Sequence, residues 1–402
     1  MSDGVRKMSS DPSAIQNDRI NLYWIDLSRF DTKINKSPWL EMGEILSNNG
    51  FNVTLLCGFE KTRYRPAGYK INIKYFRSLS FGGLFRYTLL IGMIAWLILK
   101  ARTRDVLIVR PGSLIAGLII KYARGCHLHM DVRTVPVEVH TLRDKIDRLL
   151  FWKLPLKYLR KMPDSYSFIT EPLKEAIEAE FRDKYDDYVI WHSAVNVSLF
   201  ETQVLNSDRG ESDTDKFVLF YHGTITPNRG IELVIKAISS LGPPARDNVV
   251  FRIVGRGAYV DHLRSLVSAL GLGDKVRFEG YVPYDRIPEA IRDSDCCICP
   301  LPNRPEWNVS SPIKVFEYLA CGKPIILTPI PAHRSILDNH NFVIWTEGDR
   351  IEDYAKAIDH VYRNRKQLIN YADQAIEIAR QKYDWSAQGN KLADYLHARF
   401  KQ

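Results

Sequence analysis

Cysteine is scarce in this sequence, with six residues among 402. That is too few for a disulfide framework of the kind that holds small secreted domains together. Three of the six, Cys296, Cys297 and Cys299, share one apolar run, and no second Cys/His pair lies nearby at zinc-finger spacing, so no metal site is expected. Side chains alternate along a strand, which places Cys297 and Cys299 on one face and Cys296 on the other. We therefore expect buried, reduced thiols and a cytoplasmic protein.

Long hydrophobic runs are also absent. The most apolar stretch, residues 88–99, is shorter than the roughly 20 residues that a helix needs to span a bilayer. We expect it to form a buried helix, with a helix that dips into a membrane as the alternative. Residues 1–18 are polar and lack the apolar core of a signal peptide, so we expect a disordered tail there.

Charge of either sign is moderate, because 56 Lys and Arg residues face 47 Asp and Glu residues, a formal net charge of +9. This mild excess fits an anionic ligand or an anionic membrane surface. No nucleic-acid partner is expected, since that would require a clustered basic face. The 45% hydrophobic and 26% charged residues indicate a globular protein. At about 150 residues per domain, the length predicts two or three domains.

Strand and helix patterns alternate through both halves of the chain. Short apolar runs predict strands at residues 20–25, 51–56, 105–110 and 127–132 and, after a polar linker at 206–215, at 217–221, 249–254, 276–278, 295–299 and 323–328. Such alternation predicts parallel sheets that are covered by helices on both faces. We therefore predict an α/β fold with two doubly wound, Rossmann-like domains, residues 19–205 and 216–380, which face each other across a cleft.

Two glycine-containing loops follow predicted strands of the second half. The first contains Gly223, Thr224 and Arg229. Its glycine lets the backbone approach a ligand, while the following helix N-terminus and the arginine suit a diphosphate. A tight turn with a surface arginine is the alternative. The second loop, Gly255-Arg256-Gly257, lacks the third glycine of a dinucleotide fingerprint, which argues against an NAD enzyme.

A third motif surrounds the start of a helix predicted at residues 313–320. Ser310 and Ser311 precede it, and such a start leaves free N–H groups for an anion. Lys314 and Glu317 are spaced i,i+3 and so share a face of the helix. A cation for phosphate and a carboxylate for ribose hydroxyls would suit one nucleotide. The alternative is a surface ion pair, which stabilises little.

These motifs, in this order and spacing, resemble the C-terminal half of retaining GT-B glycosyltransferases of the glycosyltransferase family 4 type. The family pattern is a Gly-Arg-x-x-x-x-Lys-Gly loop, a Gly-x-Gly strand end, a Phe-x-Gly-x-Val strand and a Glu-x7-Glu helix start ending in Glu-Ala-Met-Ala-x-Gly-x-Pro. In this chain the pattern reads Gly223-Thr224 with Arg229-Gly230, Gly255-Arg256-Gly257, Phe278-Glu279-Gly280-Tyr281-Val282, and Glu317 through Pro324. The resemblance is strong in the second half and mainly architectural in the first.

The resemblance implies a nucleotide-sugar donor bound by the second domain, retention of configuration, and no cofactor or obligatory metal. Arg229, Lys314 and helix N-termini would stabilise the leaving diphosphate. Glu317 would bind the ribose, and the base would lie near Gly257 and Tyr281-Val282. The segment around Tyr383 is similar to the end of family members, so residues 381–402 are expected to form a helix that crosses back to the first domain.

Two positions depart from the family pattern: Thr224 replaces the loop arginine, and Val309 replaces the first glutamate of Glu-x7-Glu. The residues that would stand in are Arg256 or Lys314 for the arginine and Glu306 or Asn308 for the glutamate. Some family members share the Ser-Pro-x-Lys-x-x-Glu-Tyr sequence found here, so the departures indicate a subgroup.

The first domain would bind the acceptor, but its sequence marks that site weakly. Asp131 and Arg133 follow a predicted strand in a stretch similar to Asp-x-Arg-Asp-x-Trp-Pro of related sugar transferases, with Thr134 at the second Asp. They would meet the donor sugar or the acceptor hydroxyl; a strand-end ion pair or cap is the alternative.

Residues 143–161 interleave basic residues with aromatic and aliphatic ones, as interfacial helices do, although Pro155 interrupts them. Peripheral contact with an anionic membrane is one interpretation, and a solvated charged face over a core stripe is the other.

The favoured hypothesis is a glycosyltransferase that uses a nucleotide-sugar donor and a glycan or lipid-linked acceptor, by family analogy in bacterial polysaccharide or glycoconjugate synthesis, at the inner face of the cell membrane. Two alternatives remain: a catalytically degenerate GT-B scaffold subunit, which Thr224 and Val309 would favour, and a nucleotide-sugar epimerase, which would need no acceptor.

Overall fold

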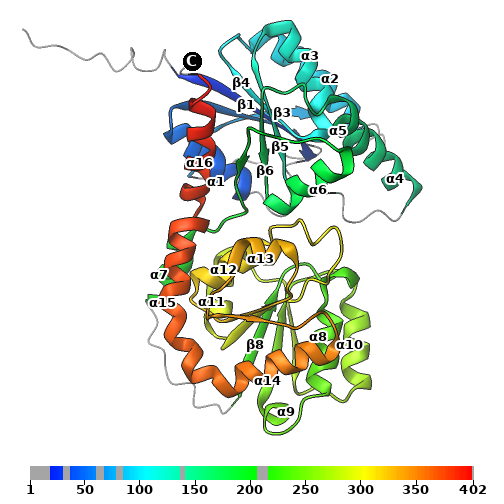
Figure 1. Cartoon of the computed structure of the whole chain (residues 1–402), viewed down its shortest axis with the longest axis vertical. Coiled ribbons are helices and arrows are strands. Elements are labelled where there is room, and N and C mark those ends of the chain that lie inside the picture. Colours follow the sequence, from blue (N-terminus) through cyan, green and yellow to red (C-terminus); the bar gives the residue numbers. More distant parts are fainter. Residues whose placement is uncertain are drawn as a thin grey trace, which may run out of the picture.

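A computed structural model of the chain describes residues 19–29, 37–59, 68–77, 85–135, 141–205 and 216–400. Each half of the chain forms one parallel sheet with helices on both faces (Figure 1). The expected tail at 1–18 and the linker at 206–215 lie outside the described residues. The two doubly wound domains that the alternating pattern predicts are therefore present.

The N-terminal sheet has seven strands in the order β3-β2-β1-β4-β5-β6-β7. Its strands are β1 (Ile20–Arg29), β2 (Phe51–Phe59), β3 (Asn72–Arg77), β4 (Val106–Val109), β5 (His127–Val132), β6 (Ser165–Phe168) and β7 (Val189–Ile190). The order reverses between β1 and β4, and the crevice at the carboxyl ends of such neighbours is where open α/β sheets bind ligands.

The helices of this half are α1 (Ser37–Asn48), α2 (Phe85–Lys100), α3 (Leu114–Arg124), α4 (Leu142–Arg148), α5 (Leu154–Leu159), α6 (Glu171–Phe181) and α7 (Val197–Leu205). Successive residues of β1 pack on opposite faces of the sheet. Leu22 and Trp24 belong to one apolar cluster, and Tyr23 and Ile25 belong to the other. The sheet is thus buried on both faces, which explains why its central strand β4 is a continuous apolar run.

Helix α2 contains the most apolar stretch of the sequence. It buries Leu89, Met93 and Leu97 but exposes Ile91 and Leu99, so the expected buried helix is buried along one side only. Among the described residues, none of the helices has the length and apolar character that crossing a bilayer requires. The basic stretch that follows β5 is divided into α4, one π-helical turn and α5, in which Pro155 occupies the first turn.

The C-terminal sheet has six strands in the order β10-β9-β8-β11-β12-β13. Its strands are β8 (Phe217–His222), β9 (Val249–Val254), β10 (Val276–Gly280), β11 (Cys296–Cys299), β12 (Ile325–Leu327) and β13 (Val343–Trp345). Cys297 and Cys299 lie in one apolar cluster and Cys296 in the other, as strand alternation predicts. All six cysteines are buried free thiols, and burial raises the pKa of Cys297 to about 12.

The helices of the second half are α8 (Ile231–Ser239), α9 (Ala245–Asn248), α10 (Val260–Ala269), α11 (Ile287–Arg292), α12 (Ile313–Ala320), α13 (Pro331–Leu337), α14 (Ile351–Leu368), α15 (Ala372–Ile378) and α16 (Trp385–His397). Helix α16 packs on α1 of the N-terminal domain (Figure 1). Helix α7, which the sequence analysis includes in the first domain, packs instead on α11 and α12 of the second, with Phe200 in the same apolar cluster as Phe316.

Candidate functional site

The loops after β8 and β9 lie against each other at the carboxyl edge of the C-terminal sheet. The N–H of Gly223 donates to the carbonyl of Val254 at 2.9 Å. A Cβ atom on Gly255 would lie 1.9 Å from the carbonyl oxygen of Gly223, and one on Gly257 would lie 1.9 Å from that of Ile225. Packing between the loops therefore requires glycine at 255 and 257, a reason separate from the ligand contact that the sequence suggests.

Lys314 lies in the first turn of α12 and is 8% exposed. Its Nζ is 3.9 Å from the ring centroid of Tyr221 and would be 2.9 Å from a Cβ on Gly223. This ammonium has no hydrogen-bond partner among the described residues. Burying an unpaired charge is costly, so the position indicates a site whose anion completes it.

Arg229 approaches the same region from the loop after β8. Its guanidinium lies 4.4 Å from the ring centroid of Trp307, and its buried Nε has no hydrogen-bond partner within the described part of the chain. Burial raises the pKa of the Cys299 thiol, and the charges of Lys314 and Arg229 both oppose that rise. A Cβ atom on Gly230, the neighbour of Arg229, would lie 1.8 Å from the carbonyl oxygen of Pro300, which directly follows β11. Arg229 therefore lies near the carboxyl end of β11, where it can hold a diphosphate together with Lys314.

Glu317 is 2% exposed and lies one turn beyond Lys314. Its Oε2 is 2.9 Å from Nε2 of His222, the last residue of β8. Partial burial and the adjacent Glu317 carboxylate raise the pKa of Tyr284. Lys314 and Glu317 are thus both buried and do not form the surface ion pair that was the alternative interpretation. Glu317 is therefore a buried carboxylate that lies close to His222.

The remaining candidates near β9 and β10 are more exposed. Arg256 lies 4.9 Å from the ring centroid of Tyr281, whose side chain is exposed. Val282 is half-buried against the core, and Thr224 is exposed. The exposed side chains of Thr224 and Tyr281 contrast with the buried side chain of Lys314.

The segment before α12 connects the two domains. Val309 is buried in the apolar cluster of the N-terminal domain, and its carbonyl accepts a hydrogen bond of 2.9 Å from the Thr170 hydroxyl. The N–H of Ser193 donates to Oγ of Ser311 at 3.1 Å. The valine that replaces the family glutamate thus makes an apolar contact between the domains. Neither Glu306 nor Asn308 is needed for that contact.

Two further candidates in this segment bond locally. The Ser310 hydroxyl donates to the carbonyl of Trp307, and the Asn308 amide donates to Oδ1 of Asn303. Oδ1 of Asn308 is buried and has no hydrogen-bond partner among the described residues. Asn308 therefore keeps an acceptor for a ligand, whereas Ser310 stabilises its own turn.

Asp131 ends a hydrogen-bonded chain between β5 and β6. The Ser167 hydroxyl donates to its Oδ1 at 2.7 Å, and Nε2 of His129 lies 2.8 Å from the same hydroxyl. The chain continues through Ser165 to His127. The register pairs His129 with Ser165 and Asp131 with Ser167, so all five side chains lie on one face. The alternating polar residues within these apolar strands are a signal that the sequence analysis missed.

The direction of donation along this series of hydrogen bonds is defined when Asp131 is ionised. A carboxylate only accepts, so Ser167 donates to it and must accept from His129. Burial lowers the pKa of His129 well below its usual range, so the ring is neutral and accepts through its other nitrogen from Ser165. Asp131 is 0% exposed, and burial raises its pKa while Arg133 and Arg110 oppose that rise. Asp131 is consequently held beneath the surface rather than presented on it.

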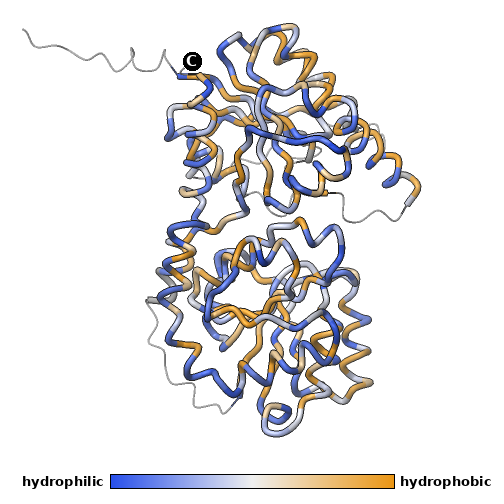
Figure 2. The backbone as a smooth tube through the Cα atoms, viewed as in Figure 1, coloured by the Kyte–Doolittle hydropathy of each residue, from blue (hydrophilic) through white to orange (hydrophobic). Residues whose placement is uncertain are grey.

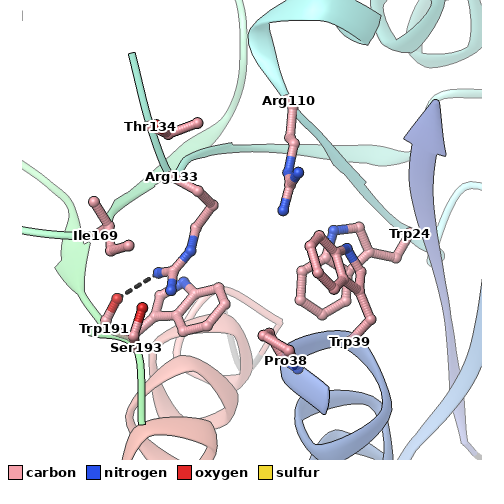
Figure 3. Close-up of a pocket in the computed structure, with 9 residues that line it drawn as sticks. All are labelled: Trp24, Pro38, Trp39, Arg110, Arg133, Thr134, Ile169, Trp191 and Ser193. Atoms are coloured by element: carbon pink, nitrogen blue, oxygen red, sulfur yellow. Dashed lines mark hydrogen bonds between the residues drawn. The ribbon is translucent and has the colours of Figure 1, made fainter. Parts of the chain in front are cut away.

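A cavity of about 170 Å³ lies at the carboxyl ends of β1, β4 and β5 (Figure 3). Its lining comprises Trp24, Pro38, Trp39, Arg110, Arg133, Thr134, Ile169, Trp191 and Ser193. Arg133 donates to the carbonyl of Trp191 and stacks 3.3 Å from the centroid of that ring. Burial lowers the pKa of Arg133 to about 9. The sequence analysis identified Arg133 but not Arg110 or the tryptophans, which are distant from it in the chain.

Comparisons with known proteins agree with this architecture. Residues 205–382 match the family model described as glycosyl transferases group 1. An uncharacterized glycosyltransferase of Methanocaldococcus jannaschii is 25% identical over 227 residues, which cover 54% of this chain and 55% of that protein. The D-inositol 3-phosphate glycosyltransferase 2 of Catenulispora acidiphila is 26% identical over 188 residues, 45% of this chain and 43% of that protein. The matches thus span about half the length of these relatives.

Solved structures extend the similarity to both domains. HepE from Anabaena in complex with UDP-glucose has a TM-score of 0.70 at 15% identity, over 94% of this chain and 100% of that one. Sucrose-phosphate synthase from Thermosynechococcus elongatus has a TM-score of 0.73 at 16% identity, over 95% and 100%. The likeness confirms the GT-B fold with its two Rossmann-like domains.

Proposed function

We propose that this GT-B chain is a group 1 glycosyltransferase that moves a sugar from a nucleotide-sugar donor to a glycan or lipid-linked acceptor, with retention of configuration. The observation that carries the proposal is the buried ammonium of Lys314, which has no hydrogen-bond partner among the described residues, with Arg229 at the same carboxyl edge of the C-terminal sheet. Two convergent cations at a strand edge fit a nucleoside diphosphate. Bacterial polysaccharide or glycoconjugate synthesis is the proposed setting, by analogy with the family.

Each group has a role in the proposed transfer. Lys314 and Arg229 stabilise the charge that develops on the leaving diphosphate, and this stabilisation strengthens in a site from which water is excluded. Because the chain supplies these cations itself, the proposal includes no obligatory metal. Glu317, which lies beside His222, accepts hydrogen bonds from the ribose, and the base lies toward Gly257 and Tyr281-Val282. The contacts of Val309 and Ser311 hold the two domains together over the donor and limit its hydrolysis.

Nucleotide binding is the first test, by thermal shift with UDP, GDP, dTDP and ADP in the presence of EDTA. UDP comes first, because the HepE structures contain it. A ligand at about 100 times its Kd adds about 2.7 kcal/mol to the stability of the native state, so a true donor nucleotide should raise the melting temperature. Glu317→Gln, which keeps the shape but weakens the acceptor, should reduce that shift.

The matched control is Glu352→Gln, on the exposed side of α14, which should leave the shift unchanged. No shift from any of the four nucleotides would contradict the proposal and would favour a degenerate scaffold subunit. A shift that persists undiminished in Glu317→Gln would remove Glu317 from the nucleotide site.

We also propose peripheral contact of the N-terminal domain with the anionic inner face of the cell membrane. Its exposed large apolar side chains gather on α2 to α5, where Figure 2 shows apolar residues along the outer helices. They are Ile91, Leu99, Ile115, Ile119, Tyr122, Leu142, Ile146, Leu149, Leu150 and Tyr158. Residues 142–161 add seven basic and two acidic residues. An anionic surface attracts such a segment by about 1 kcal/mol per nearby cation.

Co-sedimentation with vesicles tests this contact. The protein should bind phosphatidylglycerol-containing vesicles and remain free with phosphatidylcholine vesicles. Leu142 is 74% exposed, so Leu142→Glu should weaken binding several-fold without affecting the fold. Leu270→Glu, on the C-terminal domain, is the control and should bind as the wild type does. Equal binding by all three proteins, or none by the wild type, would contradict the proposal.

A further inference from the structure

The cavity of the N-terminal domain carries more positive charge than a neutral sugar needs. We propose that the acceptor bears an anionic group, a phosphate or a carboxylate on a sugar or polyol ring, which binds between Arg110 and Arg133. This inference rests on the proposed function, because it assigns the acceptor's chemistry.

The two arginines occupy equivalent places in the sheet. Arg110 directly follows β4 and Arg133 directly follows β5, so both stand at the carboxyl edge that faces the second domain. Figure 3 shows both side chains directed into one space, with indole rings on either side. A shared position at the crevice is what one ligand group needs if it is to contact both guanidinium groups.

The contacts that Arg110 makes with other described residues do not explain its buried position. Its guanidinium lies 4.7 Å from the ring centroid of Trp39, and its Nε is buried without a hydrogen-bond partner in the described part of the chain. Arg133 has the carbonyl of Trp191 as its hydrogen-bond acceptor. A guanidinium has five donors in a planar fork that matches phosphate or carboxylate oxygens. Most of these donors therefore have no acceptor in the described segments and can bind an anion.

The nearby acid does not neutralise the two cations. Asp131 acts on Arg110 and Arg133 through its charge, but among the described residues neither arginine has a carboxylate oxygen within the 4.0 Å of an ion pair. One of the carboxylate's oxygens is instead bonded to Ser167. Burial also lowers the pKa of Arg133, and the charge of Asp131 opposes that lowering while the charge of Arg110 adds to it. A bound anion would add negative charge beside both arginines.

The rest of the cavity suits a ring attached to the anion. Its volume of about 170 Å³ is far larger than the roughly 30 Å³ share of one water molecule, so a ring fits beside the charged group. Trp24, Trp39 and Trp191 provide flat apolar walls. The buried indole N–H of Trp24 has no acceptor among the described residues and can donate to a ring hydroxyl.

The cavity also lies next to the proposed donor site. Ser193 lines it, and the N–H of Ser193 donates to Ser311, which shortly precedes Lys314 and Glu317. A ring held on Arg110 and Arg133 would consequently be presented toward the sugar of the donor. This position fits the acceptor better than a regulatory ligand.

Calorimetric titration of the full chain tests the inference with four probes: glucose 6-phosphate, glucuronate, glucose and inorganic phosphate. The titrations are run with the nucleotide that binds best present at saturation, so that the donor site is occupied. At least one charged sugar should bind about tenfold or more tightly than glucose, and more tightly than inorganic phosphate. Arg110→Met should weaken that binding by about tenfold or more, the worth of a charged hydrogen bond, and Arg110→Lys should restore part of it.

Arg104→Met is the matched control, because Arg104 is an exposed arginine just before β4, the strand that Arg110 follows. It should bind all four probes as the wild type does. Equal affinity for glucose and the charged sugars would overturn the inference. So would an Arg110→Met protein that binds the charged sugar as tightly as the wild type does. Binding of inorganic phosphate as tightly as the sugar phosphate would also overturn it. Nucleotide binding without this discrimination would remove the inference alone. Discrimination in a protein that binds none of the four nucleotides would leave an anion site but would remove the proposed function and, with it, the assignment of that site to an acceptor.

Discussion

Replacing Lys314 by methionine should weaken nucleotide binding and, at the same time, raise the melting temperature of the free protein. The two effects have opposite signs because the ammonium is buried and unpaired until an anion arrives. Methionine has a similar length and no charge, so it removes the desolvation cost in the free state. It also removes the contact that the diphosphate would make.

The expected magnitudes follow from the environment of this side chain. A hydrogen bond to a charged group contributes about 1.5–3 kcal/mol, so the nucleotide should bind roughly 10- to 150-fold more weakly. In the free protein, removing the desolvation cost raises the free energy of unfolding, and losing the interaction with the Tyr221 ring lowers it. The net increase in the free energy of unfolding is about 1 kcal/mol. For a chain of this size that corresponds to a rise of about 2 °C.

Lys323→Met is the control for this substitution. The ammonium of Lys323 donates to the carbonyls of Arg292 and Ser294, so its loss should lower the melting temperature and leave nucleotide binding unchanged. Calorimetric melting and nucleotide titration of both variants give the comparison. A Lys314→Met protein that melts lower than the wild type, or that still binds the nucleotide fully, would mean that the ammonium is satisfied within the fold.

The strands that the sequence predicted are those with strong apolar patterns, such as β4 and β8. It did not predict β3, which alternates polar and apolar residues at the sheet edge, or β7, which has two residues. Strand β6 was missed because its serines interrupt the apolar run. Those serines form hydrogen bonds with His129 and Asp131. The polar residues that obscured the strand pattern thus belong to the buried series of hydrogen bonds.

The candidate site divides in a similar way. Lys314 and Glu317 could be found from one short segment, because a helix places them together through local spacing. Arg110, Trp24 and Trp191 meet only through the sheet order, in which β1 and β4 are neighbours although about 80 residues separate them. In the sequence, Val309 is only a departure from the family glutamate. The structure shows that its side chain packs in the apolar cluster of the N-terminal domain.

Asp131→Asn should stabilise the protein at neutral pH and strengthen the binding of anionic sugars in the neighbouring cavity. Burial raises the pKa of Asp131 above its ordinary value of 3.8, so the ionised form is the unfavourable one in the folded state. Asparagine resembles the neutral form and can still accept from Ser167. Loss of one negative charge beside Arg110 and Arg133 should tighten anion binding by about tenfold.

The stabilisation expected of Asp131→Asn depends on pH. The relevant pH window lies between the pKa of Asp131 in the unfolded chain and its higher pKa in the folded protein. Within that window the native protein binds more protons than the unfolded chain, so the wild type loses stability as the pH rises. The melting temperature of Asp131→Asn should therefore equal that of the wild type below about pH 4 and exceed it toward neutral pH. Asp164→Asn, at the opposite end of the same strands, breaks an ion pair of 2.6 Å with Lys121 and should destabilise instead.

The same variant separates two roles for Asp131. A carboxylate that takes the proton of the acceptor hydroxyl must touch it, and its loss would slow turnover by about 10²- to 10⁴-fold without tightening anion binding. Asp131 is fully buried and is not part of the cavity lining, which favours a residue that acts on Arg110 and Arg133 through its charge. Tighter anion binding with a pH-dependent gain in stability would identify this electrostatic role. Unchanged anion binding with turnover lost would instead place Asp131 in direct contact with the acceptor.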